Sequence, residues 1–164
     1  MCGIVGYVGA RQAAPILLDG LSKLEYRGYD SAGICVSTNG AFAISKTKGR
    51  LAVLAEQTAN GARLVGTTGI GHTRWATHGA PSDVNSHPHC STDGKIVVHN
   101  GIIENYLPLK EFLLKNGKTF VSETDTEVIA NLLEYFYEWE GDLLFAARRA
   151  AEMMEGSYAL AIVC

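Results

Sequence analysis

MCGIVGYVG, residues 1–9, opens the chain and places a cysteine at the second position. Initiator methionine is normally removed only before a small side chain, so this order favours a mature chain that begins with Cys2. A thiol and a free α-amine would then share one residue, and the amine, with a reference pKa of about 7.7–8.0, could serve the thiol as a general base. The alternative is a chance cysteine that is buried as a small hydrophobic residue.

β-Branched residues gather in five runs that predict strands, the first of which follows Cys2. They are residues 4–8, 33–37, 42–46, 68–73 and 96–100. Helical spacing predicts four helices: one with Leu17, Leu21 and Leu24, one around residues 109–113 that Gly117 ends, one that the capping-box pattern Thr124-Asp125-Thr126-Glu127 opens, and one over about residues 143–154. Early strands and late helices predict an α+β fold in which helices cover antiparallel sheet.

Composition indicates a single globular domain of 164 residues, with 47% hydrophobic and 19% charged residues. The net charge of −3 gives no reason to expect nucleic acid or an anionic membrane as a partner. No apolar run approaches the roughly 20 residues that span a bilayer. The four cysteines, at positions 2, 35, 90 and 164, are too far apart for a zinc or disulfide framework and favour a reducing cytoplasm.

The sequence ends inside the apolar run GSYALAIVC, residues 156–164, which is typical of a strand. Because an unpaired apolar strand edge invites association, natural domains seldom end there. We therefore expect a piece of a longer protein.

Three polar, glycine-containing loops follow predicted strands or helices, at residues 25–33, 72–89 and 100–105. Binding and catalytic groups concentrate in such loops. We expect all three to converge on one face near Cys2.

Arg74 stands next to Trp75 in the segment HTRWATHG, residues 72–79. A guanidinium can bind both oxygens of a carboxylate, and the indole could cover the pair. The alternative is a surface loop with a solvated arginine.

Asn100 and Gly101 end a predicted strand, and a side-chain amide followed by a glycine N–H could stabilise an oxyanion. Asn-Gly is also the commonest tight-turn dipeptide, so a hairpin turn is the alternative.

Asp125 and Glu127 open a predicted helix, where they could cap it or bind a ligand ammonium. A cation and an anion offered to one ligand would suit a free α-amino acid.

Five histidines, at positions 72, 78, 87, 89 and 99, make a metal site one alternative. None has helix-borne HExxH spacing, so we expect loop residues that form hydrogen bonds, and no metal. The sequence also lacks GxGxxG and GxxxxGK[ST], and we expect no cofactor.

Five stretches together resemble the class II glutamine amidotransferase domain, whose members are N-terminal-nucleophile hydrolases. They are MCGIVGYVG at 1–9, LEYRGYDSAG at 24–33, GHTRWATHGAPSDVNSHPH at 71–89, HNGIIEN at 99–105 and FVSETDTEVIA at 120–130. Tyr26, Tyr29 and Ile102-Ile103 follow the aminosugar-forming branch of this family. Amidophosphoribosyltransferases look more like LQHRGQ(D/E)SAG, and asparagine synthetases carry RGPD.

The resemblance implies a role for each candidate residue. Cys2 would be the nucleophile with its own α-amine as proton shuttle, and Asn100 and the Gly101 backbone would form the oxyanion hole. Seven residues would bind or enclose the substrate: Arg74, Thr77 and His78 at its α-carboxylate, Asp125 at its α-ammonium, Trp75 as a closing lid, and Arg27 and Gly28 near the nucleophile.

The family fold is a four-layer αββα sandwich with two largely antiparallel sheets, which we expect over residues 1–164. The implied reaction is hydrolysis of the L-glutamine side-chain amide to glutamate and ammonia through a cysteine thioester. In longer enzymes of this branch, sugar-isomerase-type domains, absent here, use the ammonia to make glucosamine 6-phosphate from fructose 6-phosphate. The resemblance implies a homodimer for such a full-length enzyme, and we expect a monomer for the isolated domain.

Three alternatives stay open: the same domain of an amidophosphoribosyltransferase, a non-catalytic module that senses an amino acid, and a structural domain that binds metal through its histidines. A chain in which Met1 stays attached would favour the sensing module, because an amide nitrogen cannot act as a base.

Overall fold

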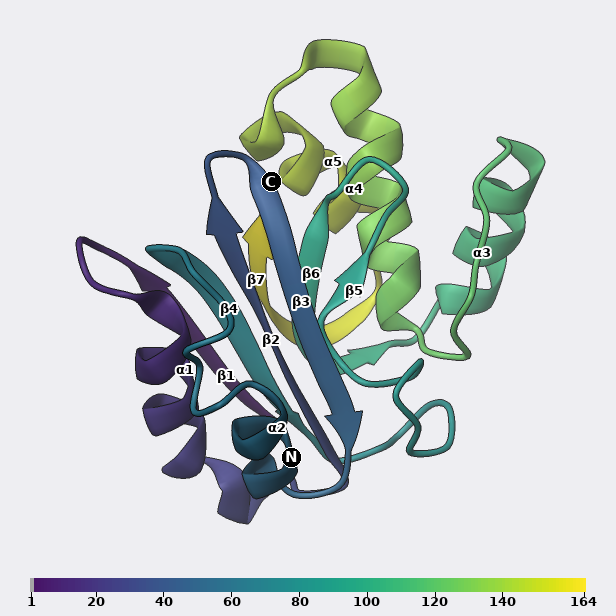
Figure 1. Cartoon of the computed structure of the whole chain (residues 1–164). Helices are drawn as coiled ribbons and strands as arrows, with labels where there is room; N and C mark the ends of the chain where they lie inside the picture. The colour runs from purple at the N-terminus through teal and green to yellow at the C-terminus, as the bar shows by residue number, and fades with distance from the viewer. Residues whose placement is uncertain (1) are drawn as a thin grey trace.

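Two antiparallel sheets lie between helices in the computed structural model, which describes residues 2–164 (Figure 1). The expected removal of Met1 falls on a residue outside this range. The strand order is β1-β4-β2-β3 in one sheet and β5-β6-β7 in the other. The strands are β1 (Gly3–Val8), β2 (Ser31–Thr38), β3 (Ala41–Lys48), β4 (Thr68–Arg74), β5 (His89–Cys90), β6 (Ile96–Ile103) and β7 (Gly156–Val163).

Helices cover the outer face of each sheet (Figure 1). They are α1 (Ala13–Ser22), the 3-10 helix η1 (Glu25–Arg27), α2 (Leu51–Gln57), α3 (Tyr106–Lys115), α4 (Thr126–Glu140) and α5 (Leu143–Met153). α1 and α2 pack on the four-stranded sheet, whereas α4 packs on the three-stranded sheet. α3 and α5 pack in turn against α4.

Three separate clusters of buried hydrophobic residues define four layers. The first lies between α1, α2 and the four-stranded sheet, the second lies between the two sheets, and the third lies between the three-stranded sheet and α3–α5. Successive residues of a strand point to opposite faces, so Ile34 of β2 joins the first cluster and Cys35 joins the second. The expected α+β sandwich of αββα type is therefore confirmed.

Three strands reach into the margins of segments that we expected to be loops, and the first of them, β2, begins at Ser31. β4 continues to Arg74, which pairs with Ser31, and β6 continues through Asn100 and Gly101 to its end. The expected loop boundaries were wrong because partner strands and buried hydrogen bonds satisfy the polar groups of these residues. Hydrophobic periodicity does not reveal such partners. α2 and β5 were not expected from the sequence, and the helix that was expected to include Leu24 ends at Ser22.

The capping box expected at the start of α4 is wrong. Asp125 is the N-cap residue, but its side chain makes no capping hydrogen bond. The Glu127 carboxylate accepts hydrogen bonds from the backbone N–H groups of Val121 and Ser122, at 2.8 and 2.7 Å, instead of reaching back to the cap. The Asp125 carboxylate is thereby left for a different partner.

Strand register sets the position of Cys2. Gly3 of β1 pairs with Thr73 of β4, so Cys2 lies beside Arg74 at the end of that ladder. β1 and β4 also contact β6, which brings Asn100 to the same end. Three segments that are distant in sequence therefore meet at one edge between the two sheets.

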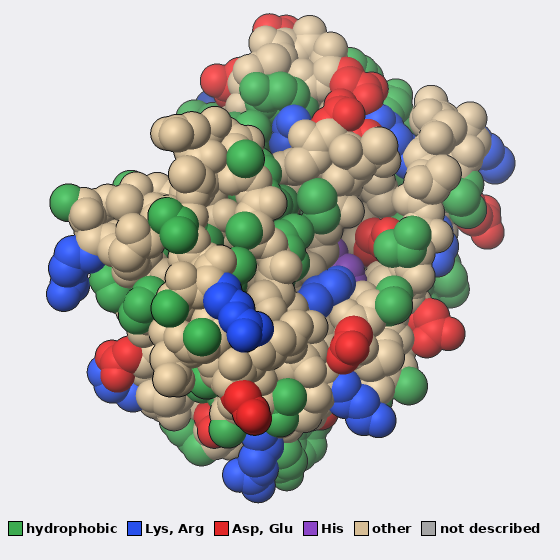
Figure 2. Space-filling view, viewed as in Figure 1, with side chains coloured by type: hydrophobic (Ala, Val, Ile, Leu, Met, Phe, Trp, Pro, Cys, Tyr) green, Lys and Arg blue, Asp and Glu red, His purple; other side chains and the backbone are tan. Residues whose placement is uncertain are grey.

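No helix among residues 2–164 is both long enough and apolar enough to cross a bilayer. On the face shown in Figure 2, acidic and basic side chains are interspersed, and neither charge forms a broad patch. Histidine is visible on this face only inside a hollow, in keeping with the burial of His72, His87, His89 and His99.

Candidate active site

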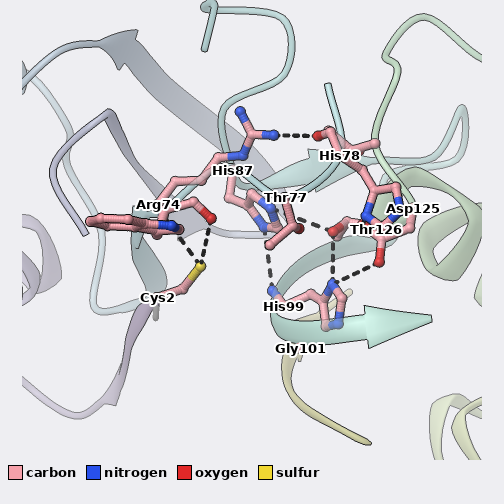
Figure 3. Close-up of a pocket in the computed structure, with 11 residues that line it drawn as sticks. Cys2, Arg74, Thr77, His78, His87, His99, Gly101, Asp125 and Thr126 are labelled. Atoms are coloured by element: carbon pink, nitrogen blue, oxygen red, sulfur yellow. Dashed lines mark hydrogen bonds and ion pairs between the residues drawn. The ribbon is translucent and has the colours of Figure 1, made fainter. Parts of the chain in front are cut away.

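Cys2 is half-buried just before β1, with its thiol against the segment that follows β4 (Figure 3). Its Sγ accepts a hydrogen bond from the Trp75 backbone N–H at 3.4 Å, and its backbone nitrogen donates to Asn100 Oδ1 at 3.3 Å. Burial raises the pKa of the Cys2 thiol, although the Trp75 backbone contact and the nearby Arg74 charge oppose this rise. The thiol is therefore protonated at neutral pH and needs a base to become a nucleophile.

Arg74 is buried at the end of β4, with 3% of its surface exposed, so the alternative of a solvated surface arginine is wrong. One guanidinium nitrogen, Nη2, donates to the carbonyl oxygens of His78 and Gly79. The other, Nη1, is buried and has no hydrogen-bond partner among residues 2–164. Burial lowers the pKa of Arg74, and the charges of Asp30, Cys2 and Asp125 counteract this. A buried cation with a free N–H group is suited to an anionic ligand.

Asp125 is also 3% exposed, and it faces the same cleft from the start of α4. Its Oδ2 accepts the backbone N–H of Ile103 at 2.9 Å, which ties the helix to β6. Its Oδ1 lies 4.0 Å from His78 Nδ1, and its Oδ2 lies 3.9 Å from His99 Nδ1. The carboxylate therefore has one backbone donor and still presents an oxygen to the cleft.

Asn100 and Gly101 lie within β6, so the hairpin-turn alternative is wrong. Gly101 has a φ of +140°, and a Cβ there would lie 2.2 Å from the Ser157 carbonyl oxygen. This position therefore requires glycine. Because Asn100 Oδ1 already accepts from Cys2, its Nδ2 donors are left for another group.

These segments enclose a polar cleft with about 10 Å³ of free volume, which holds no more than one water molecule. A more apolar hollow of about 310 Å³ adjoins it. The cleft is lined by Cys2, Arg74, Trp75, Thr77, His78, His87, His99, Gly101, Thr124, Asp125 and Thr126. The hollow is lined by Cys2, Trp75, Thr77, Asn100, Gly101 and Ile102.

The structure thus brings eight of the ten expected site residues together around the cleft and hollow: Cys2, Arg74, Trp75, Thr77, His78, Asn100, Gly101 and Asp125. The other two, Arg27 and Gly28, do not line either space. Gly28 packs behind the site, where a Cβ would lie 2.7 Å from the Arg74 carbonyl carbon. It supports the backbone that carries Arg74 and Trp75.

Cys2 is the only one of the four free cysteines that lines the cleft. Cys35 is buried between the sheets, and burial raises its pKa to about 12. Cys90 and Cys164 are exposed elsewhere.

Four further residues of the cleft were not among the expected site residues: His87, His99, Thr124 and Thr126. The histidines were expected in loops, but His72, His89 and His99 lie on strands. His72 and His87 stack with ring centroids 3.9 Å apart. The stretches that carry the family resemblance contain all of these residues, and that is the one signal that pointed to them.

Acid should destabilise the folded chain, because His72, His87 and His89 are buried in their neutral form. Burial lowers the pKa of His72 to about 3, and it lowers the pKa values of His87 and His89 well below the ordinary value. Below about pH 6.5 the unfolded chain therefore binds protons that the folded chain does not, and stability falls as pH drops. From pH 7 to 5.5 each ring should cost a little over 1 kcal/mol, or roughly 4 kcal/mol for the three.

Urea unfolding at the two pH values measures this loss. His89→Gln, which removes one of the three rings, should reduce the pH-dependent part by about a third. Equal free energies of unfolding at pH 7 and pH 5.5 would show that these rings are charged or exposed in the folded chain.

Among residues 2–164, the histidines do not bring ligand atoms together for a metal ion, so the structure gives no support to the metal-binding alternative. The one group there with converging ligand atoms is Asp93, Glu134 and Glu138. Lys118 Nζ lies 2.8 and 2.6 Å from the last two carboxylates and neutralises much of their charge. The histidine ring nitrogens that form hydrogen bonds instead face threonines and backbone groups of the chain.

The sequence pattern of the family described as "Glutamine amidotransferase domain" matches residues 72–164, which contain most of this cleft. The chain therefore belongs to the glutamine amidotransferase domain family. Among its relatives is the glutamine–fructose-6-phosphate aminotransferase [isomerizing] of Caldanaerobacter subterraneus subsp. tengcongensis, 63% identical over 165 residues that cover 100% of this chain and 27% of that protein. A protein of the same name from Thermus thermophilus is 58% identical, covering 99% of this chain and 26% of its own length.

The chain thus spans about a quarter of the length of these curated relatives. Among solved structures, the glutamine phosphoribosylpyrophosphate amidotransferase from B. subtilis complexed with ADP and GMP matches with a TM-score of 0.83 and 27% identity. That match covers 99% of this chain and 35% of the other. The αββα fold is therefore shared with a solved amidotransferase, whereas sequence identity is much higher to the fructose-6-phosphate enzymes.

Proposed function

We propose that this chain hydrolyses the side-chain amide of L-glutamine to glutamate and ammonia, with Cys2 as nucleophile. One observation carries the proposal: a single cleft holds a thiol, the buried carboxylate of Asp125 and Arg74 Nη1, which has no hydrogen-bond partner among residues 2–164. A free α-amino acid has a carboxylate for the cation and an ammonium for the anion. Its side chain then extends toward the thiol.

Substrate recognition follows from charge and burial. Arg74 would bind the α-carboxylate through Nη1, assisted by Thr77 and His78, while Asp125 would bind the α-ammonium with the Gly101 backbone. The cleft has about 10 Å³ of free volume and adjoins the hollow of about 310 Å³, and we propose that its lining segment moves as glutamine binds. Trp75 lies on that segment and is half-exposed. Its ring makes an edge contact with Tyr29, with ring centroids 5.7 Å apart, and it would close over the substrate.

The chemistry needs a base beside Cys2 Sγ, because burial raises the pKa of the thiol. Once Met1 is removed, the α-amine of Cys2 would take the thiol proton as sulfur attacks the amide carbon. Asn100 Nδ2 and the Gly101 N–H would stabilise the oxyanion. The amine would return the proton to the departing nitrogen, which leaves as ammonia, and water would then hydrolyse the thioester to glutamate and the free thiol.

We also propose that residues 1–164 are the glutaminase portion of a longer enzyme of the aminosugar-forming branch. The support is the 63% identity to a glutamine–fructose-6-phosphate aminotransferase, of which the match covers 27%. In such an enzyme, sugar-isomerase-type domains would use the ammonia to make glucosamine 6-phosphate from fructose 6-phosphate. The proposal includes a homodimeric full-length enzyme, a monomeric isolated domain, no nucleic-acid or membrane partner, and a cytoplasmic location that keeps the thiol reduced.

The test is incubation of the protein that begins at Cys2 with L-glutamine. Glutamate and ammonia should appear in equal amounts, and D-glutamine should not react because, with its charged groups on Arg74 and Asp125, its side chain would point away from Cys2. Release of neither product from L-glutamine would overturn the proposal.

Two substitutions should separate binding from chemistry. Arg74→Ala removes a charge-assisted contact present in both ground and transition states, so KM should rise about 10- to 100-fold with a smaller change in kcat. Asn100→Ala removes a donor to the oxyanion, so kcat should fall about 10²- to 10³-fold with little change in KM.

Steady-state kinetics distinguishes these outcomes, with Arg63→Ala as the control. Arg63 donates to the Gln57 carbonyl oxygen far from the cleft, so its loss should leave both constants unchanged. The reverse pattern, a kcat effect for Arg74 and a KM effect for Asn100, would mean that their roles are exchanged.

A further inference from the structure

His87 joins the two elements that carry the proposed oxyanion and ammonium sites (Figure 3). Its Nδ1 lies 3.3 Å from the backbone nitrogen of His99, the residue directly before Asn100. Its Nε2 lies 3.4 Å from Oγ1 of Thr126, the residue directly after Asp125. One buried ring therefore bridges β6 and the start of α4, and the proposed mechanism assigns it no part.

The hydrogen-bond partners determine where the His87 proton lies. A backbone N–H can only donate, so Nδ1 of His87 accepts from His99 and carries no proton. The neutral ring then has its proton on Nε2, directed at Thr126 Oγ1. Thr126 Oγ1 lies 2.9 Å from His99 Nδ1 and can donate its own proton to that atom, which closes a circuit of three hydrogen bonds.

The neutral state of this circuit is favoured by its surroundings. Burial, first of all, lowers the pKa of His87, and the neighbouring histidines and Arg74 lower it further. A proton added at Nδ1 would also face the His99 N–H, a donor, and break that hydrogen bond.

The segment that carries His87 is fixed from the other sheet as well. Lys46 of β3 donates through Nζ to the carbonyl oxygens of Val84 and Ser86, both at 3.0 Å, and to that of Pro88 at 3.4 Å. Three contacts to one ammonium hold the chain on both sides of His87. The ring is therefore a fixed spacer.

We propose that His87 is a positioning residue for glutamine hydrolysis: as an Nε2–H imidazole it fixes the distance between the Asn100–Gly101 segment and Asp125. This inference rests on the proposed function. Glutamine would contact Asp125 through its ammonium and the oxyanion donors through its amide, at opposite ends of one ligand. An error of about 1 Å between these sites can cost about 100-fold in rate.

Paired substitutions test the two ends of the ring. His87→Asn retains an acceptor near the Nδ1 position and loses the donor to Thr126, whereas His87→Gln has the opposite effect. Each should raise KM and lower kcat, with kcat/KM falling about 10- to 100-fold. Thr126→Val, which removes the hydroxyl with little change in shape, should do the same, and Thr126→Ser should restore nearly normal values.

Non-additivity separates positioning from simple packing. If His87 and Thr126 act in one circuit, His87→Asn combined with Thr126→Val should be no worse than the more damaging single change. Multiplied losses would contradict a shared circuit. Leu54→Ala, in the core between α1, α2 and the sheet, is the control for lost stability, and it should leave the kinetic constants unchanged.

Nitrogen-15 NMR of the histidine rings reads the circuit without any activity measurement. His87 should be the Nε2–H tautomer and should not titrate between pH 5.5 and 8. An Nδ1–H tautomer, or a ring that titrates near pH 6.5, would overturn the role of His87. Full activity in all the variants would overturn this role alone, whereas a wild-type protein that does not hydrolyse glutamine would overturn the proposed function and this role with it.

Discussion

Cys2→Ala should abolish glutamine hydrolysis, with a loss of at least about 10³-fold, because the covalent route needs the Cys2 sulfur. The fold should persist, since Cys2 precedes β1 and lies outside the three hydrophobic clusters. A glutamate-release assay gives the rate, and thermal unfolding gives the stability. The other cysteines offer no replacement, because Cys35 is buried and the remaining two lie away from the cleft.

Cys90→Ala is the matched control, because it removes an exposed thiol outside the cleft. It should hydrolyse glutamine at the normal rate. Residual turnover in Cys2→Ala above about a hundredth of wild type would exclude a covalent route through Cys2, since loss of a nucleophile costs far more.

Blocking the N-terminus should be nearly as damaging although the thiol remains. One leucine inserted between Met1 and Cys2 should prevent methionine removal and convert the Cys2 nitrogen into an amide, which cannot accept the thiol proton. Loss of general-base catalysis costs about 10²- to 10⁴-fold. The inserted residue would also occupy space beside Sγ that the substrate amide needs.

The control is the same chain with a protease site placed so that cleavage releases Cys2 as the first residue. Cleavage should restore activity, and intact mass should confirm both forms. Full activity in the uncleaved chain would mean that a side chain is the base, and a histidine of the cleft would then be the first candidate.

Local sequence patterns predicted antiparallel sheet covered by helices, and the family resemblance supplied the four-layer order. Runs of β-branched residues indicated five of the seven strands, and the apolar run at residues 156–164 indicated the last strand, β7. α2 has only seven residues and β5 only two, too short for a periodic pattern to be distinguished from loop sequence.

Site residues could be predicted where a reactive or charged side chain stands at the end of a predicted strand or helix. Roles that depend on hydrogen-bond partners elsewhere in the fold could not be predicted. Cys2, Arg74 and Asp125 come together because each stands at the end of a strand or helix. The cap expected from Thr124 to Glu127 does not form, because the Glu127 carboxylate accepts the N–H groups of Val121 and Ser122 instead. The Asp125 carboxylate has its partner on Ile103, 22 residues away in sequence. His87 was unpredictable for the same reason, since both of its hydrogen-bond partners are distant in sequence.

The most direct test of the central claim is to trap the acyl group on Cys2. Protein that begins at Cys2 is mixed with L-glutamine, quenched in acid within the first turnover, and measured by intact mass and by peptide mapping. A mass increase of one γ-glutamyl group on the peptide that contains Cys2, absent from Cys2→Ser and from samples with D-glutamine, is the predicted result. Glutamate release without that group, or with the group on any other residue, would contradict the account.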